Sequence, residues 1–229
     1  MNIVDLRAQL ELDLTWRSNE LVFLHNQISS LEKEDDQNLL RRFAVVMLYA
    51  HFEGFTKTAL SIYADAINAE QVAAVDAHEA IAALTLSDAL RAMCNPDQKT
   101  DLFRRTLPHD GELHRFARHR EFVERWRDFS RMVVSIPIDD VVDTESNLRP
   151  VVLRKCLYRL GLDASIVEQY EGAINELLNR RNAVAHGSSK DGVQELVYRT
   201  LHRRVTELME ALILAIVSAI ENRAYLSVA

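Results

Sequence analysis

Arg181, Asn182 and His186 precede Gly187 at the end of a segment whose hydrophobic spacing predicts a helix. When the residues from Ile166 onward are placed around an ideal helix at about 100° per residue, Arg181 falls within the apolar face. Asn182 and His186 then share an adjoining face. A guanidinium on a desolvated face needs a carboxylate, a phosphate or a partner chain, because it keeps its proton. Periodicity alone favours a structural interpretation, a buried salt bridge at Arg181 with His186 as a cation at the helix C-terminus.

Four stretches of the chain resemble the HEPN superfamily. The segment Arg181–Gly187 reads Arg-Asn-Ala-Val-Ala-His-Gly and resembles the family signature, in which an Arg and a His lie four to six residues apart and Asn commonly follows the Arg. Residues 48–57 resemble the second-helix segment of a cyanobacterial-type HEPN subfamily, and residues 146–150 followed by 160–163 resemble the segment before its Arg-Asn motif. Residues 95–135 contribute little to the resemblance.

The resemblance implies an all-α fold, a helical bundle of HEPN type in one domain over residues 1–229. All four prolines lie between residues 95 and 150, and only one convincing helix is expected there, so this section is predicted to be an irregular helical insertion. It implies a homodimer and a metal-independent endoribonuclease that cleaves single-stranded RNA, in a toxin or phage-defence system with an antitoxin or other defence protein as partner. The site residues would be Arg181, Asn182 and His186. The alternative is a noncatalytic module of the same fold that binds RNA or a partner protein.

The chemistry suits these residue types. The 2′-hydroxyl of RNA can attack the adjacent phosphate, so a protein needs to supply only a base, an acid and a cation. His186 has a suitable intrinsic pKa, and Arg181 has the geometry for bidentate phosphate binding. In an uninterrupted helix these two side chains point about 140° apart. A two-fold dimer would therefore bring two Arg–His pairs to one cleft.

Glu53 lies at the edge of the apolar face of its predicted helix, at a position that the resemblance marks as polar. It could hold Arg181 in place or tune His186. Alternatively, it forms an exposed pair with Lys57, four residues later, which would contribute only a few tenths of a kcal/mol. The sequence favours neither interpretation.

A locally basic and aromatic section runs from Phe103 to Met132, with eight arginines against five acidic residues. Arginine provides a cation for phosphate and an aromatic ring can stack on a base, so Arg115, Arg118 and Arg125 are candidate RNA-binding residues. The alternative is an amphipathic helix with solvated arginines and three aromatic side chains turned inward: Phe122, Trp126 and Phe129.

Hydrophobic spacing and breakers predict the order of the elements. The first two helices should form an antiparallel hairpin, and residues 32–38 should form a charged turn between them. The last helix is nearly apolar all round at 211–217, which predicts a central helix or one in a dimer interface. The expected helices are 3–31, 39–68, one or two over 70–94 ending at Asn95-Pro96, about 112–131, 147–161, 163–186 capped by Asp163, and 197–219.

Composition supports this helical expectation. The chain has only 6 Gly and 4 Pro among 229 residues, whereas loop-rich β folds need these residues more often. The net charge of -7 provides no overall basic field, so any contact with nucleic acid must be a local patch.

The remaining composition predicts a cytoplasmic protein without a cofactor or metal. Cys94 and Cys156 have no zinc-type spacing. Charged residues interrupt the first hydrophobic stretch, unlike the core of a signal peptide. The longest apolar run, 211–220, is about half the length needed to span a bilayer, so no membrane partner is expected.

Overall fold

The computed structural model describes residues 2–227, which form helices and, in that range, no β-strand beyond two isolated bridges. This confirms the predicted all-α class. The α-helices are α1 (Ile3–Ser29), α2 (Glu34–Ala69), α3 (Glu79–Thr85), α4 (Ser87–Cys94), α5 (Gly111–Asp128), α6 (Ile138–Val141), α7 (Pro150–Arg159), α8 (Glu171–Ala185) and α9 (Glu195–Glu221). Three 3₁₀ helices join them: η1 (Ala74–Asp76), η2 (Phe129–Arg131) and η3 (Ala164–Tyr170).

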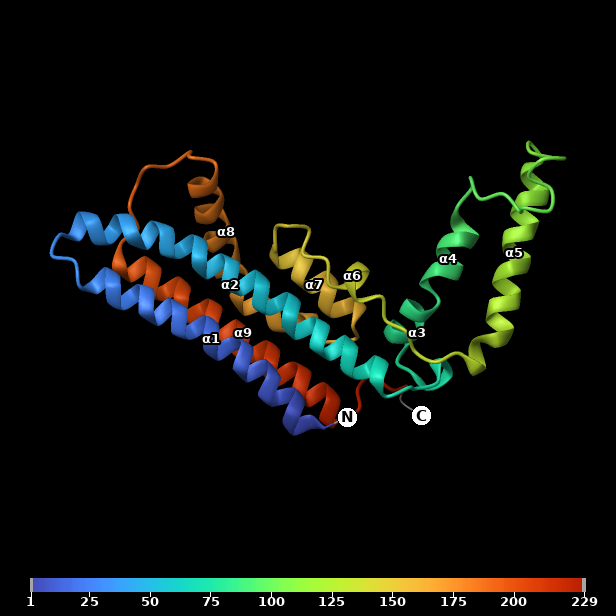
Figure 1. Ribbon diagram of the computed structural model, residues 1–229, viewed down its shortest axis with the longest axis horizontal. Coiled ribbons are helices and arrows are strands. Elements are labelled where there is room, and N and C mark those ends of the chain that lie inside the picture. The colour runs from blue at the N-terminus through green and yellow to red at the C-terminus, as the bar shows by residue number, and fades with distance from the viewer. Residues whose placement is uncertain (1, 228–229) are drawn as a thin grey trace.

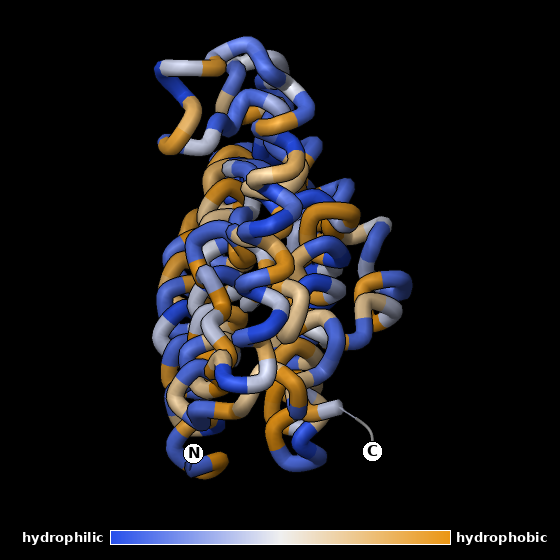
Figure 2. The backbone as a smooth tube through the Cα atoms, turned by 90° about the vertical axis from the view of Figure 1, so that its right-hand side faces the viewer, coloured by the Kyte–Doolittle hydropathy of each residue, from blue (hydrophilic) through white to orange (hydrophobic). Residues whose placement is uncertain are grey.

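The long helices α1, α2 and α9 lie side by side, and α8 packs on α2 and α9 (Figure 1). The predicted α1–α2 hairpin is confirmed. Hydrophobic and hydrophilic residues alternate along the backbone, as amphipathic helices require (Figure 2). Helix α9 is central, although Leu214 within its apolar stretch is 63% exposed. Helix α2 contributes many core side chains with no exposed surface, among them Leu48, Phe52, Phe55, Tyr63 and Ile67.

Helix α2 begins at Glu34, so most of the predicted charged turn at 32–38 is helical. Its first turn contains Glu34, Asp35 and Asp36. Carboxylates are favourable at a helix N-terminus, where the free N–H groups carry partial positive charge. The early start adds more than one turn, and this added part of α2 contacts the loop that follows His186.

The segment before the Arg-Asn motif differs from the prediction. Asp163 was predicted to cap one long helix that runs to His186, but it caps the short 3₁₀ helix η3. Its Oδ1 accepts a hydrogen bond from the Ser165 N–H at 2.8 Å. Helix α8 begins only at Glu171.

Helices α4 and α5 pack against each other and extend as an arm away from the bundle (Figure 1). The predicted stop at Asn95-Pro96 is confirmed, since α4 ends at Cys94, and α5 corresponds to the helix predicted at about 112–131. His114 is 3% exposed. Its Nε2 lies 2.9 Å from the Leu107 carbonyl oxygen, and its Nδ1 accepts from the Thr100 N–H at 3.3 Å. His114 therefore stabilises the arm.

Candidate active site

Arg181 lies in the last turns of α8, one helical turn after the buried residues Leu177 and Leu178. Its side chain is half-buried. Nη1 donates to Asn182 Oδ1 at 2.8 Å, and Nη2 lies 3.5 Å from the Ser146 carbonyl oxygen. Within residues 2–227 no carboxylate pairs with this guanidinium, so the buried salt bridge favoured by periodicity is wrong.

The apolar contact of Arg181 is an aromatic ring. Its guanidinium carbon lies 4.4 Å from the centroid of the Tyr49 ring on α2, within the range of a cation–π interaction. Tyr49 is 2% exposed, and its hydroxyl oxygen accepts the Leu148 N–H at 2.7 Å. Burial raises the pKa of Tyr49 to about 12, and the Glu53 carboxylate also raises it. The phenol therefore stays neutral and presents a fixed ring face to the cation.

Glu53 lies one turn after Tyr49 on α2, and its Oε1 accepts a hydrogen bond from Thr144 Oγ1 at 2.5 Å. Thr144 has no exposed surface. Among the described residues Glu53 forms an ion pair with neither Lys57 nor Arg181, so the exposed Glu53–Lys57 pair is wrong. Its contacts with Tyr49 and Thr144 instead hold the ring on which Arg181 rests.

The loop before α7 completes this cluster, and sequence reasoning missed the role of its residues. Thr144 and Leu148 belong to this loop, in which Glu145 and Ser146 have positive φ angles of 54°. Leu148 has no exposed surface. The only sequence signal was the resemblance of residues 146–150 to a family segment.

His186 is exposed at the C-terminal cap of α8. Its backbone N–H donates to the Asn182 carbonyl at 2.9 Å, and its ring forms no hydrogen bond or ion pair with residues 2–227. Gly187 ends the helix with φ +65°, and the Ser188 N–H donates back to the Ala183 carbonyl at 3.0 Å. The imidazole is therefore free to reach a ligand, at the helix end that also carries Arg181.

The loop between α8 and α9 is attached to the N-terminal turns of α2. Arg42 Nη2 donates to the Ser189 carbonyl at 2.6 Å, and the Val193 N–H donates to the Asn38 carbonyl at 2.9 Å. A Cβ at Gly192 would lie 2.7 Å from the Asn38 Cβ, so glycine is required for this approach.

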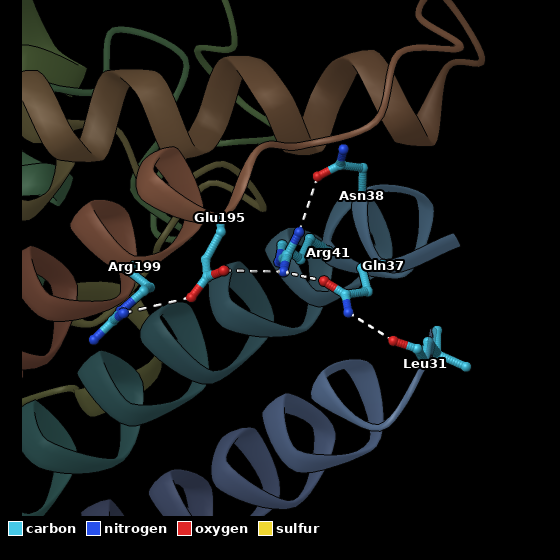
Figure 3. Close-up of polar contacts among 6 residues, drawn as sticks. All are labelled: Leu31, Gln37, Asn38, Arg41, Glu195 and Arg199. Carbon is cyan, nitrogen blue, oxygen red and sulfur yellow. Dashed lines mark hydrogen bonds and ion pairs between the residues drawn. The ribbon is translucent and has the colours of Figure 1, made fainter. Parts of the chain in front are cut away.

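Arg41 strengthens the same attachment (Figure 3). It is 3% exposed. Its guanidinium donates to Asn38 Oδ1 and Gln37 Oε1 at 2.9 Å each, and lies 3.4 Å from Glu195 Oε2 at the start of α9. The start of α2 thus fixes both ends of the loop that follows His186.

The three candidate RNA-binding arginines on α5 have different surroundings. Arg118 donates to the Gln98 carbonyl at 2.9 Å and to the Met93 carbonyl at 3.3 Å, so it stabilises the arm. Arg115 is exposed and lies 3.8 Å from Glu112. Arg125 is exposed and forms no hydrogen bond or ion pair within the described range.

The exposure of the aromatic side chains in this region also differs from that expected for an amphipathic helix with its rings turned inward. Trp126, expected inward, is 56% exposed and stacks on the half-buried Phe129 at a centroid distance of 5.4 Å. Phe116 is 66% exposed. The arm therefore presents aromatic rings to solvent beside Arg115 and Arg125.

Two features are absent from residues 2–227. They contain no cluster of three or more His, Cys, Asp or Glu side chains suited to a metal ion. In the same range, no helix combines the length and the apolar character that crossing a bilayer requires.

These features define an all-α protein with an Arg–His motif at the end of a helix packed on a central helix. The chain belongs to the HEPN superfamily: the family profile described as HEPN_MAE_28990-like HEPN matches residues 6–225. No curated protein and no solved structure matches the chain. Membership points to a nuclease, RNA-related or toxin role, and HEPN domains commonly dimerise.

Proposed function

We propose that the chain is a metal-independent endoribonuclease that cleaves single-stranded RNA in a toxin or phage-defence system. One observation carries the proposal: the half-buried Arg181 guanidinium has no carboxylate partner among the described residues and lies at the same helix end as the exposed His186. A cation without an internal counter-ion is suited to bind phosphate.

The proposed step conserves atoms and charge without a co-reactant. The 2′-oxygen bonds to phosphorus, its proton passes to a base, and the bond from phosphorus to the 5′-oxygen breaks as an acid protonates that oxygen. His186 serves in one of these proton transfers, and the His186 of a second copy serves in the other. Arg181 stabilises the charge on the phosphorane, and the products are a 2′,3′-cyclic phosphate and a 5′-hydroxyl.

A hydrophobic stripe on α2 supports the homodimer that this step uses. Leu39, Phe43 and Met47 are spaced four residues apart and are 43%, 48% and 42% exposed. They lie on the helix that carries Tyr49 and anchors the His186 loop. Contiguous exposed apolar side chains of this size mark contact surfaces, so the stripe is proposed as the contact between copies.

The decisive experiment is RNA cleavage in EDTA with analysis of the product ends. The wild type should release a 2′,3′-cyclic phosphate and a 5′-hydroxyl, and His186→Ala should lower the rate by roughly 10²–10⁴. The matched control is His119→Ala, an exposed histidine on α5, which should cleave at the wild-type rate.

Two results would overturn the proposal. Equal trace cleavage by wild type and His186→Ala would indicate a contaminant, and the noncatalytic RNA-binding or protein-interaction module would then be the better interpretation. The contacts of Arg181 with Asn182 and Tyr49 suit that module equally well. Cleavage that is lost in EDTA would contradict the metal-independent step.

A further inference from the structure

A cavity of about 760 Å³ lies between α3 and the end of α7, outside the candidate active site. Its apolar lining includes Leu84 on α3 and Leu162 after α7, which are each 7% exposed. The volume lies within the range of small-molecule sites, which is about 300–1,000 Å³. The polar lining comes from five side chains: His78, Glu79, Tyr158, Arg159 and Asp163.

Tyr158 presents an aromatic ring to solvent at this cavity. It lies in the last turn of α7 and is 76% exposed. A tyrosine that served only the core would turn its ring inward, as Tyr49 and Tyr63 do. An exposed ring beside a cavity provides a face on which an unpaired nucleobase can stack.

A short chain of contacts joins the cavity to Arg181. Arg181 Nη2 lies 3.5 Å from the Ser146 carbonyl oxygen. The adjacent residue Glu145 contacts Lys155 on α7, with 2.5 Å between Oε1 and Nζ. Tyr158 follows Lys155 by three residues, which is about 4.5 Å along the helix axis. An RNA strand with its scissile phosphate at Arg181 therefore reaches the cavity within a few nucleotides.

The cations along this path contact carboxylates that a phosphate can replace. Glu145 lies 4.0 Å from Arg149 in addition to its contact with Lys155, and Arg154 pairs with Glu171 at 2.9 Å. These side chains are between 33% and 53% exposed, and partly exposed ion pairs contribute little. An RNA phosphate can therefore take the place of the carboxylate between Arg149 and Lys155.

The charge inside the cavity favours the base over the phosphate. The lining contains two carboxylates, Glu79 and Asp163, and one arginine, Arg159. Arg159 Nη1 already donates to the Asp140 carbonyl oxygen at 2.6 Å. The lining therefore repels a phosphate and accepts hydrogen bonds from N–H groups.

Glu79 is the carboxylate that is available to a ligand. The two oxygens of Asp163 accept from the Ser165 N–H and hydroxyl at 2.8 Å each. Glu79 lies 3.7 Å from His78 Nε2, and its side chain is 88% exposed. Guanine has two adjacent donors, N1–H and the N2 amino group, whereas uracil has a single N–H. A carboxylate acceptor therefore favours guanine.

We infer that this cavity binds an unpaired guanine of the RNA substrate, a few nucleotides from the phosphate at Arg181. The base stacks on Tyr158, its edge donates to Glu79, and the phosphates between the two sites contact Arg149 and Lys155. The inference rests on the proposed function, because it describes how the strand that is cut is bound. It adds a binding site outside both the active site and the arm.

Binding of an uncleavable oligonucleotide tests the inference without cleavage. A single-stranded 2′-fluoro oligouridylate with one central guanosine lacks the attacking 2′-hydroxyl. The wild type should bind it roughly tenfold more tightly than the all-uridine oligonucleotide, the value of one charge-assisted hydrogen bond. Glu79→Gln should bind the two with similar affinity. Equal binding of both oligonucleotides by the wild type would overturn the inference.

Substitutions of Tyr158 test the stacking. Tyr158→Phe should bind the guanosine oligonucleotide like the wild type. Tyr158→Ala should bind it more weakly by roughly five- to 150-fold, the range for the loss of one stacked base. The matched control is Phe23→Ala, a 66% exposed ring on α1, which should bind like the wild type. Unchanged affinity in Tyr158→Ala would contradict a base site at this cavity.

The inference and the proposed function can fail separately. If wild type and His186→Ala cleave RNA equally while guanosine binding still depends on Tyr158, the cleavage proposal is wrong and the base site remains, in an RNA-binding module. If cleavage depends on His186 while Tyr158→Ala binds and cleaves like the wild type, the base site is wrong and the cleavage proposal remains.

Discussion

The Arg181 guanidinium carbon, near the end of α8, lies 4.4 Å from the centroid of the Tyr49 ring in the middle of α2. This contact joins the Arg-Asn motif to the hydrophobic core. The ring is held in turn by the Leu148 N–H on its hydroxyl and by Glu53 one turn away. Tyr49 is therefore a positioning residue, which acts on the proposed reaction through Arg181.

Two substitutions of Tyr49 distinguish the contribution of its ring from that of its hydroxyl. Tyr49→Phe keeps the ring and leaves the buried Leu148 N–H without its acceptor, so it should lower stability by about 1–3 kcal/mol with little change in cleavage. Tyr49→Leu also removes the cation–π contact, about 0.5–2 kcal/mol, and should lower kcat further by up to roughly tenfold. Urea unfolding and cleavage kinetics measure both effects. Equal kcat in the two variants would contradict the positioning role.

Most helices could be predicted because their determinants are local. Apolar spacing marked α1, α2 and α9, and Asn95-Pro96 and Gly187 stopped α4 and α8 as expected. The positions of Asn182 and His186 at one helix end also followed from spacing. These signals act within a few residues, so no knowledge of the tertiary structure was needed.

The surroundings of Arg181 could not be predicted, because they depend on residues distant in the sequence. Leu148 follows Tyr49 by 99 positions, and Thr144 follows Glu53 by 91. Helical spacing placed Glu53 near Lys57, but the Glu53 carboxylate accepts a hydrogen bond from Thr144 instead. The sequence analysis also placed the residues from Ile166 onward on a single α-helix. The first of them belong to η3, where the backbone follows 3₁₀ geometry, so their positions around the helix differ from the prediction.

The loop after His186 should depend on Arg42. Arg42→Gln removes the hydrogen bond to the Ser189 carbonyl, so amide hydrogen exchange over 187–194 should become faster while helix content stays unchanged. Cleavage should fall, because the backbone that places His186 is less well fixed. Hydrogen exchange with mass spectrometry measures the first effect. Lys57→Gln, an exposed change on the same helix, is the control, and unchanged exchange in Arg42→Gln would refute the anchor.

On the arm, only exposed arginines should contribute to RNA binding. The double variant Arg115→Gln with Arg125→Gln should weaken RNA binding and reduce the slope of log affinity against log salt by roughly one to two, because each phosphate contact releases counterions. Arg118→Gln should mainly lower the stability of the arm, since its guanidinium binds two carbonyls. Binding measured over a salt series tests this, and an unchanged slope in the double variant would show that these arginines are only solvated.

Stability should fall on acidification through His51, which is 4% exposed. Burial lowers its pKa from the ordinary value of 6.5, against the opposing charge of Glu20. The unfolded chain therefore binds the proton more readily than the folded chain does. The contribution of neutral His51 to stability is fully present above pH 6.5 and is lost as the pH falls below that value. Between about pH 7 and pH 5, the free energy of unfolding measured in urea should fall less for His51→Gln than for the wild type. His202 has a shift of the same sign, so only the difference between the two curves reports on His51.

The hydrophobic stripe of α2 should hold the two copies together. Light scattering at micromolar concentration should give a dimer for the wild type and a monomer for Phe43→Glu, because a charge within an apolar contact costs its desolvation. Phe43 is 48% exposed, so the variant should keep the helical circular dichroism of the wild type. The matched control is Leu102→Glu, a 75% exposed position outside the stripe, which should remain dimeric. If the step uses two copies of His186, the Phe43→Glu monomer should also lose cleavage. A wild-type monomer at these concentrations would remove the composite site, whereas a dimeric Phe43→Glu would place the contact on another face.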